Sequence, residues 1–222
     1  VTGIVTDVDT VTRRLKTAGA LAIWDYAAGA PYLPMDMGDG AAAKDAIVLS
    51  PHKFPGGPGA SGIMVVRDSI VRRTTPTLPG GGTVSFVSPW GHAYSARVEA
   101  REEAGTPNVV GDIRAALVML VKDAVGTHAI LEREEALRQR AVDRWTQVPG
   151  IRLLGQKPGM TALPIFSFQV VDPQGTLVHQ QMFTRMLSDM WGIQVRGGCA
   201  CAGPYAHRLL GLDDAASQAL FL

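Results

Sequence analysis

One short segment places a histidine and a lysine in a loop that is rich in glycine. The segment "LSPHKFPGGPGASG", residues 49–62, follows an apolar run and contains His52 and Lys53. We predict that Lys53 lies just beyond the C-terminal end of a central strand, where open α/β sheets bind their ligands. The glycines allow the backbone to come close to a ligand. The alternative is an exposed lysine in a flexible turn.

Asp25 is a second residue that could do chemistry, because it ends the otherwise apolar run "ALAIWD". A carboxylate at this position is exposed at the sheet edge or paired with a cation, since burying it alone is expensive. An exposed strand-end aspartate or a helix cap would account for it as well. If the two strands are neighbours, however, Asp25 and Lys53 share one crevice.

The two cysteines, Cys199 and Cys201, are separated by a single alanine. They are too close for an ordinary disulfide and too few for a structural zinc site, so no metal is expected. Free cysteines fit a reducing cytosol, and we expect a cytoplasmic protein. The alternative to a reactive role is that the cysteines pack a loop as small hydrophobic residues.

The elements that must position these residues are indicated by apolar runs and helical spacing. We expect a helix over 7–19, strands over 20–26, 46–50 and 62–67, and an irregular segment over 74–105. Two helices over 108–126 and 127–147 follow, the second with a solvated, charged face. We then expect strands over 151–155, 162–171 and 192–199, with a helix around 179–190.

This order of elements predicts an α/β fold in two parts. Residues 1–125 form part of a larger domain with a mainly parallel sheet, and residues 126–222 form a connector helix and a smaller α+β domain, with the boundary near 125–150. The 222 residues are 46% hydrophobic with a net charge of +1. This composition is typical of a folded protein. Its basic residues are not gathered into a block, so neither nucleic acid nor an acidic membrane is an expected partner.

Four segments, in order and at matching spacing, resemble a known family across nearly the whole chain. They are "ALAIWDYAAGAPYLPMDM", "SPHKFPGGPGASGIMVV", "EEAGTPNVVG" and "VRGGCACAGP". They are similar to the class V aminotransferase and cysteine desulfurase-like group of fold-type I enzymes, which use pyridoxal 5'-phosphate (PLP). The resemblance implies a PLP-transferase large domain followed by a small C-terminal domain, and a homodimer with shared active sites.

The resemblance also implies roles for particular residues. Lys53 corresponds to the lysine that forms a Schiff base with PLP, and Asp25 to the acid that pairs with the pyridine nitrogen. Ser50 and His52 correspond to contacts of the cofactor phosphate, and Thr106 to a residue that reaches the phosphate in the neighbouring subunit.

The C-terminal motif "RGGCAC" resembles the desulfurase loop. Cys201 corresponds to the cysteine that takes sulfur from the substrate as a persulfide, for which a thiolate is required. The second arginine that desulfurases place about fifteen residues later is replaced by Ala216, so Arg196 becomes the candidate for binding the substrate carboxylate. A protein that accepts the sulfur is a further expected partner.

The chain departs from the family pattern in two ways. Ala28 stands where the desulfurases usually have a donor to the phenolic oxygen of the cofactor. The glycine-rich phosphate loop and the ring-stacking residue belong to the N-terminal half of the pattern, which these residues do not include. We therefore expect a fragment, truncated also at its C-terminus, that is inactive alone.

The favoured activity is sulfur transfer from L-cysteine, and two alternatives remain open. A class V aminotransferase, lyase or epimerase acting on another amino acid would share Lys53 and Asp25 without needing Cys201. A non-catalytic, dimerising remnant would need none of the three.

Overall fold

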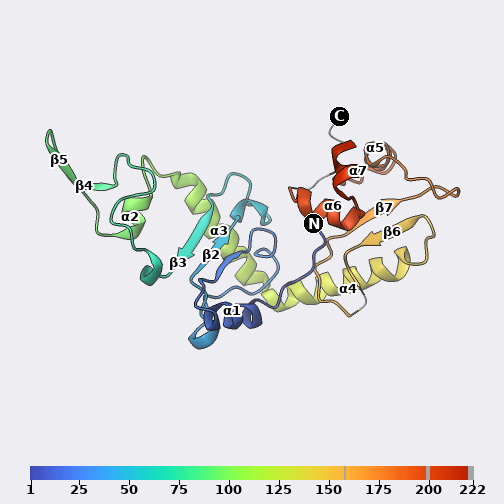
Figure 1. The fold of residues 1–222 in the computed structure, drawn as a ribbon, viewed down its shortest axis with the longest axis horizontal. Helices are drawn as coiled ribbons and strands as arrows, with labels where there is room; N and C mark the ends of the chain where they lie inside the picture. The colour runs from blue at the N-terminus through green and yellow to red at the C-terminus, as the bar shows by residue number, and fades with distance from the viewer. Residues whose placement is uncertain (158, 199–200, 220–222) are drawn as a thin grey trace. The chain divides into compact units, whose positions relative to one another are not determined.

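The structure, a computed structural model, describes residues 1–157, 159–198 and 201–219. It contains two compact units (Figure 1). One comprises residues 7–130, and the other combines residues 1–6 with residues 131–222. The sequence predicts two parts that follow one another along the chain. In the structure, Ile4 forms an antiparallel bridge with Ala162, which joins the first residues of the chain to the second unit. No helix in the described residues is long and apolar enough to cross a membrane.

The unit of residues 7–130 is built on a three-stranded sheet with the order β1-β2-β3. β1 and β2 are parallel, with Asp25 beside Val48, but β2 and β3 are antiparallel. β3 returns antiparallel because a parallel return needs a helical crossover that residues 50–62 do not contain. The elements are α1 (Val8–Thr17), β1 (Ile23–Asp25), η1 (Gly40–Ala42), β2 (Ala46–Leu49), η2 (Pro51–Lys53), β3 (Ile63–Val66), η3 (Asp68–Ile70), β4 (Val84–Ser88), β5 (Gly91–Tyr94), α2 (Val98–Glu102) and α3 (Val109–Val125).

The segment predicted to be irregular, residues 74–105, contains regular structure. β4 and β5 pair as an antiparallel hairpin, and the short helix α2 follows them. The prediction was wrong here because prolines and glycines flank the β-branched and aromatic residues that form β4. These turn residues mark the ends of the hairpin and do not interrupt its strands.

The core of this unit lies between the sheet, α3 and the loops that leave the strands. Its buried residues are Tyr26, Ala30, Ile47, Phe54 and Val118. Tyr26 directly follows Asp25, and Phe54 directly follows Lys53. The neighbours of the two chemically interesting residues therefore pack into one cluster.

The other unit pairs a two-stranded antiparallel sheet with helices (Figure 1). Trp145, near the end of α4, packs edge-on against Phe166 with the ring centroids 4.9 Å apart, which anchors the helix to the segment entering β7. A strand was also predicted over 192–199, but the described residues 192–198 form none. The elements are α4 (Thr127–Trp145, which begins in the first unit), β6 (Ile151–Leu154), β7 (Ser167–Val170), α5 (Gln180–Trp191), α6 (Gly203–Leu210) and α7 (Asp214–Ala219).

A partly buried ion pair joins α1 to the residue that precedes β2. Both carboxylate oxygens of Asp45 accept from the ammonium of Lys16, at 2.6 and 2.5 Å, and Oδ2 also accepts from the Ala22 amide at 2.7 Å. The lysine hydrogen bond, followed by the amide, holds the pKa of Asp45 below its ordinary value of 3.8. The carboxylate is thus more acidic in the folded chain than in the unfolded one.

This depressed pKa predicts that the unit loses stability in acid. The contribution of Asp45 is fully present above pH about 4 and disappears as the pH falls through the lower pKa of the folded state. We expect Asp45→Asn to cost about 2 kcal/mol at pH 7 and less at pH about 2, where the carboxylate becomes protonated. Urea unfolding at both pH values measures this difference. Exposed Asp39→Asn, which removes no cap hydrogen bond, is the matched control, and an equal loss at both pH values would contradict the prediction.

Candidate active site

The parallel pairing of β1 and β2 brings two predicted site residues to the same sheet edge. Asp25 is the last residue of β1, and the amide of Tyr26 donates to the carbonyl of Val48 at 2.9 Å. Lys53 follows Val48 by five residues, at the end of η2. Asp25 is exposed, and its Oδ1 accepts from the Ala27 amide at 2.7 Å, which fixes the carboxylate at the start of the outgoing loop.

The turn η2 displays His52 and Lys53 to solvent while it buries Pro51. The Lys53 amide donates to the carbonyl of Ser50 at 2.9 Å, and the Phe54 amide donates to the carbonyl of Pro51 at 3.0 Å. Phe54, only 3% exposed, then anchors the turn in the core. Ser50, His52 and Lys53 thereby share one turn, which follows β2 at the same edge of the sheet where Asp25 ends β1.

One face of α3 holds the glycine-rich loop that follows Lys53. The carbonyl of Gly111 accepts from the Ser61 amide at 3.2 Å, and the guanidinium of Arg114 donates to the carbonyl of Pro58. Thr106 lies exposed, two residues before Asn108, whose side chain caps α3 by accepting from the Gly111 amide at 3.2 Å. The helix that packs against η2 therefore also fixes the backbone beside Thr106.

Gly57 lies where a side chain would collide with the Lys53 turn. A Cβ at this position would overlap the carbonyl oxygen of Pro51 and lie 2.9 Å from that of Phe54. Both atoms belong to the backbone, so the turn must move to make room. Glycine is required here for this close approach of two backbone segments.

We therefore expect Gly57→Ala to destabilise the chain by about 2–3 kcal/mol, as overpacking against backbone does. Gly62→Ala is the matched control, because the nearest atom to its Cβ is the carbonyl oxygen of Leu49 at 3.9 Å. Urea denaturation of the two variants measures the difference. Equal free energies of unfolding for the two variants would contradict the prediction, because the turn would then move aside at little energetic cost.

The other unit brings Arg196 and Cys201 into contact. The Arg196 guanidinium donates to Sγ of Cys201 at 3.4 Å, and both side chains are exposed. Cys201 has a φ of 58°, a strained value for a residue with a side chain, and such strain clusters at functional sites. Cys199, the second cysteine singled out by the sequence, lies outside the described residues. The sequence assigned Arg196 to the substrate carboxylate, whereas here it contacts the thiol.

The loop that carries Arg196 rests on the first turn of α5. A Cβ at Gly197 would overlap Oε1 of Gln180 and lie 3.1 Å from Cγ2 of Thr184. The absence of a side chain at Gly197 thus lets the Arg196 segment lie against the helix.

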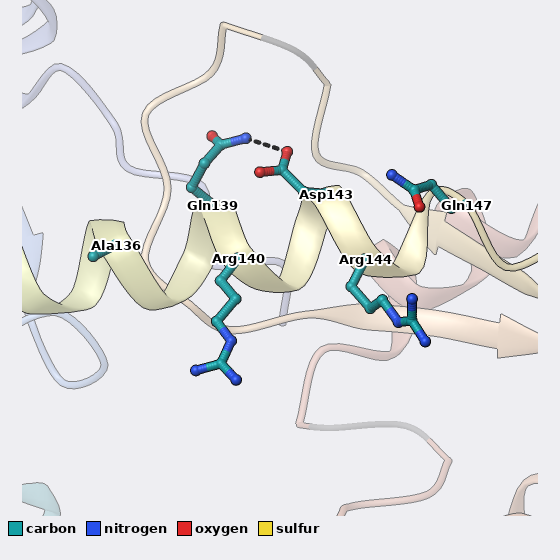
Figure 2. Close-up of a pocket in the computed structure, with 6 residues that line it drawn as sticks. All are labelled: Ala136, Gln139, Arg140, Asp143, Arg144 and Gln147. Carbon is teal, nitrogen blue, oxygen red and sulfur yellow. Dashed lines mark hydrogen bonds between the residues drawn. The ribbon is translucent and has the colours of Figure 1, made fainter.

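A hollow on α4 contains none of the predicted site residues. Its volume is about 560 Å³. Figure 2 shows Arg140 and Arg144 pointing to one side of the helix, while Gln139 donates to Asp143 at 2.6 Å on the other. These charged side chains form the solvated face that the sequence predicts for this helix. The residues lining the hollow are Ala136, Gln139, Arg140, Asp143, Arg144 and Gln147.

Sequence reasoning missed the contribution of α3 to the site. Gly111, Ala115 and Val118 are its buried residues, and Lys122 continues the same stripe at helical spacing. A lysine on a buried stripe was the available signal. The sequence alone did not reveal which loops that stripe contacts.

Comparison with known proteins gives a consistent set of matches. The family model described as Aminotransferase class-V matches residues 1–216. A probable cysteine desulfurase 2 of Mycobacterium leprae is 32% identical over 209 residues, which cover 94% of this chain and 47% of that protein. A probable cysteine desulfurase of Streptomyces coelicolor is 30% identical over 201 residues, covering 90% of this chain and 46% of that protein.

Solved structures match in the same way. The apo cysteine desulfurase of Thermococcus onnurineus superimposes with a TM-score of 0.82 at 26% identity, covering 95% of this chain and 50% of that one. The cysteine desulfurase CsdA of Escherichia coli gives a TM-score of 0.77 at 27% identity, covering 96% and 49%. These matches confirm the predicted α/β fold class. The chain spans about half the length of the relatives that it matches.

Proposed function

The chain belongs to the aminotransferase class-V family, and from this membership we propose that it forms part of a PLP-dependent enzyme of the cysteine desulfurase type. The family resemblance predicted from the sequence is thereby confirmed. The observation that carries the functional proposal is the placement of Asp25 and Lys53 at one edge of the sheet. The activity, substrate and partners of the whole protein are part of the proposal.

The residues at this edge fit PLP chemically. Lys53 offers an amine for the cofactor aldehyde, and Asp25 offers a carboxylate for the pyridine nitrogen. Ser50 and His52 offer a hydroxyl and an imidazole to the phosphate, as Thr106 would from the neighbouring subunit of a homodimer. Ala28 offers no donor, so a contact with the phenolic oxygen comes from another position. When bound, PLP supplies an electron sink for the substrate's α-carbon.

The protein residues then have separate tasks. Asp25 keeps the pyridine nitrogen protonated, and Lys53 moves a proton at the substrate's α-carbon. The Cys201 thiolate attacks the sulfur of L-cysteine, so that an S–S bond forms as the C–S bond breaks. The electron pair of the C–S bond stays with the carbon, which takes up a proton, and alanine leaves while Cys201 carries a persulfide.

The contact between Arg196 and Cys201 supports desulfurase chemistry over the other activities of the family. A guanidinium beside a sulfur stabilises a negative charge on it, and the thiolate is the nucleophilic form. The contact places Arg196 beside the candidate nucleophile, and its role toward the substrate carboxylate stays a prediction. The persulfide sulfur would pass to an acceptor protein.

The test is the product pattern of the full-length protein, supplied with PLP and L-cysteine. A desulfurase forms alanine and sulfur in equal amounts. A lyase forms pyruvate and ammonia, and an aminotransferase forms a keto acid without releasing sulfur. Alanine and sulfur in equal amounts support the proposal, and either other pattern, or no uptake of PLP at all, overturns it.

A further inference from the structure

Lys122 on α3 is a half-buried lysine that binds backbone and no acid. Its ammonium donates to the carbonyl oxygens of Ala30 at 2.7 Å and Leu33 at 2.5 Å. Within the part of the chain that the structure describes, no carboxylate forms an ion pair with it. Its pKa is lowered by burial. Partial burial of a cation opposes folding, and the two hydrogen bonds to carbonyl oxygens offset this loss of hydration.

The first attachment of Lys122 leads to Asp25. Ala30 is fully buried, and its amide donates to the carbonyl of Tyr26 at 2.7 Å. Tyr26 is the residue after Asp25 and belongs to the buried cluster. The loop that carries the carboxylate is therefore tied to α3 by a continuous set of contacts.

The second attachment leads to Lys53. The Lys122 ammonium lies 6.0 Å from the centre of the Phe54 ring, at the range of a cation–π interaction. Phe54 follows Lys53 directly and packs in the same cluster as Tyr26 and Val118. One ammonium thus contacts the segments that follow both members of the strand-end pair.

We propose that Lys122 is a positioning residue that fixes Asp25 and Lys53 relative to each other. It touches neither of them and acts through the loop of Tyr26 and through Phe54. Small displacements of these two side chains would weaken cofactor binding, because the groups of a binding site must be held to within a fraction of an ångström. This inference rests on the proposed function in one respect: the pair that Lys122 positions is the pair assigned to PLP.

The test compares Lys122→Met, which keeps the aliphatic stem, with Lys122→Arg, which keeps a cation and its donors. Amide hydrogen exchange is followed by mass spectrometry in two segments, residues 26–33 and residues 50–57, without added PLP. We expect Lys122→Met to accelerate exchange in both segments about tenfold, as the loss of charge-assisted hydrogen bonds would. Lys122→Arg restores exchange close to that of the parent.

Lys16→Met is the matched control, because it also removes a lysine with two short hydrogen bonds, to Asp45. It lowers the thermal midpoint but leaves exchange in both segments close to that of the parent. Acceleration confined to residues 26–33, or equal acceleration in Lys16→Met, would overturn the inference and leave Lys122 with a merely structural role. If Lys122→Met does not fold, Lys122→Gln, which keeps one donor group, is expected to give a smaller acceleration in both segments, and none would overturn the inference.

A second readout uses PLP in the full-length protein. We expect Lys122→Met to lower the yield of borohydride-trapped PLP on Lys53 about tenfold and to shift its visible absorbance band, since reaction depends on the placement of the amine. Lys122→Arg restores both. A parent protein that takes up no PLP would refute the proposed function, whereas the exchange experiment would still decide the role of Lys122.

Discussion

Replacement of Lys53 by alanine is expected to abolish covalent capture of PLP by the full-length protein, reducing it by a factor on the order of a thousand. The chain has five lysines, and three of them are already engaged. Lys16 and Lys44 form ion pairs with aspartates, and Lys122 donates to two carbonyls. Lys53 is exposed in the turn η2, where an aldehyde can reach it.

The measurement is borohydride reduction followed by peptide mass spectrometry, which identifies the lysine that carries the cofactor. Lys157→Ala is the control, because Lys157 is exposed and lies in the other unit. It should capture PLP as the parent does. Undiminished capture in Lys53→Ala, or a label on another lysine, would refute the assignment of Lys53.

Local signals in the sequence predicted those parts of the site that depend on local structure. Asp7 caps α1 by accepting from the Thr10 amide, as the predicted start of that helix requires. The apolar runs that precede Asp25 and Lys53 form strands in the structure, so Asp25 ends β1 and Lys53 lies in the turn that follows β2. These features follow from a few neighbouring residues, and the sequence contains them all.

Pairing between distant segments was harder to predict. The register that sets Asp25 beside Val48 depends on which strands meet, and β3 turned out antiparallel. The apolar pattern of residues 192–198 predicted a strand, but a strand also needs a partner, which an apolar pattern does not identify. The hydrogen bonds of Lys122 span about ninety residues of sequence, and only the fold reveals them.

The roles of the site residues stay predictions, although their placement is now described. Asp25, Ser50, His52 and Lys53 lie around one sheet edge because two parallel strands end there. Arg196 and Cys201 form a second group in the other unit, held by the close packing of Gly197 on Gln180. The first group fits cofactor binding, and the second fits sulfur transfer. A substitution in each group should therefore affect a different step.

Replacement of Cys201 by serine is expected to reduce sulfur release from L-cysteine by a factor on the order of a thousand in the full-length protein, with PLP capture unchanged. A serine hydroxyl does not ionise at neutral pH and cannot carry the transferred sulfur. Serine has nearly the size of cysteine, so the strained backbone at this position should tolerate it. The loss would therefore report on sulfur chemistry and leave the loop intact.

Alanine and sulfide are measured together, and Cys199→Ser serves as the matched control in the same motif. We expect Cys199→Ser to keep most of the activity, because Cys201 is the cysteine that corresponds to the persulfide carrier of the family. Unchanged sulfur release in Cys201→Ser would remove the persulfide role and favour a lyase, in which sulfide leaves without transfer to the protein. Loss of PLP capture in the same variant would place Cys201 in the cofactor site, because a residue that acts only on the substrate sulfur has no reason to affect the anchoring of the aldehyde to Lys53.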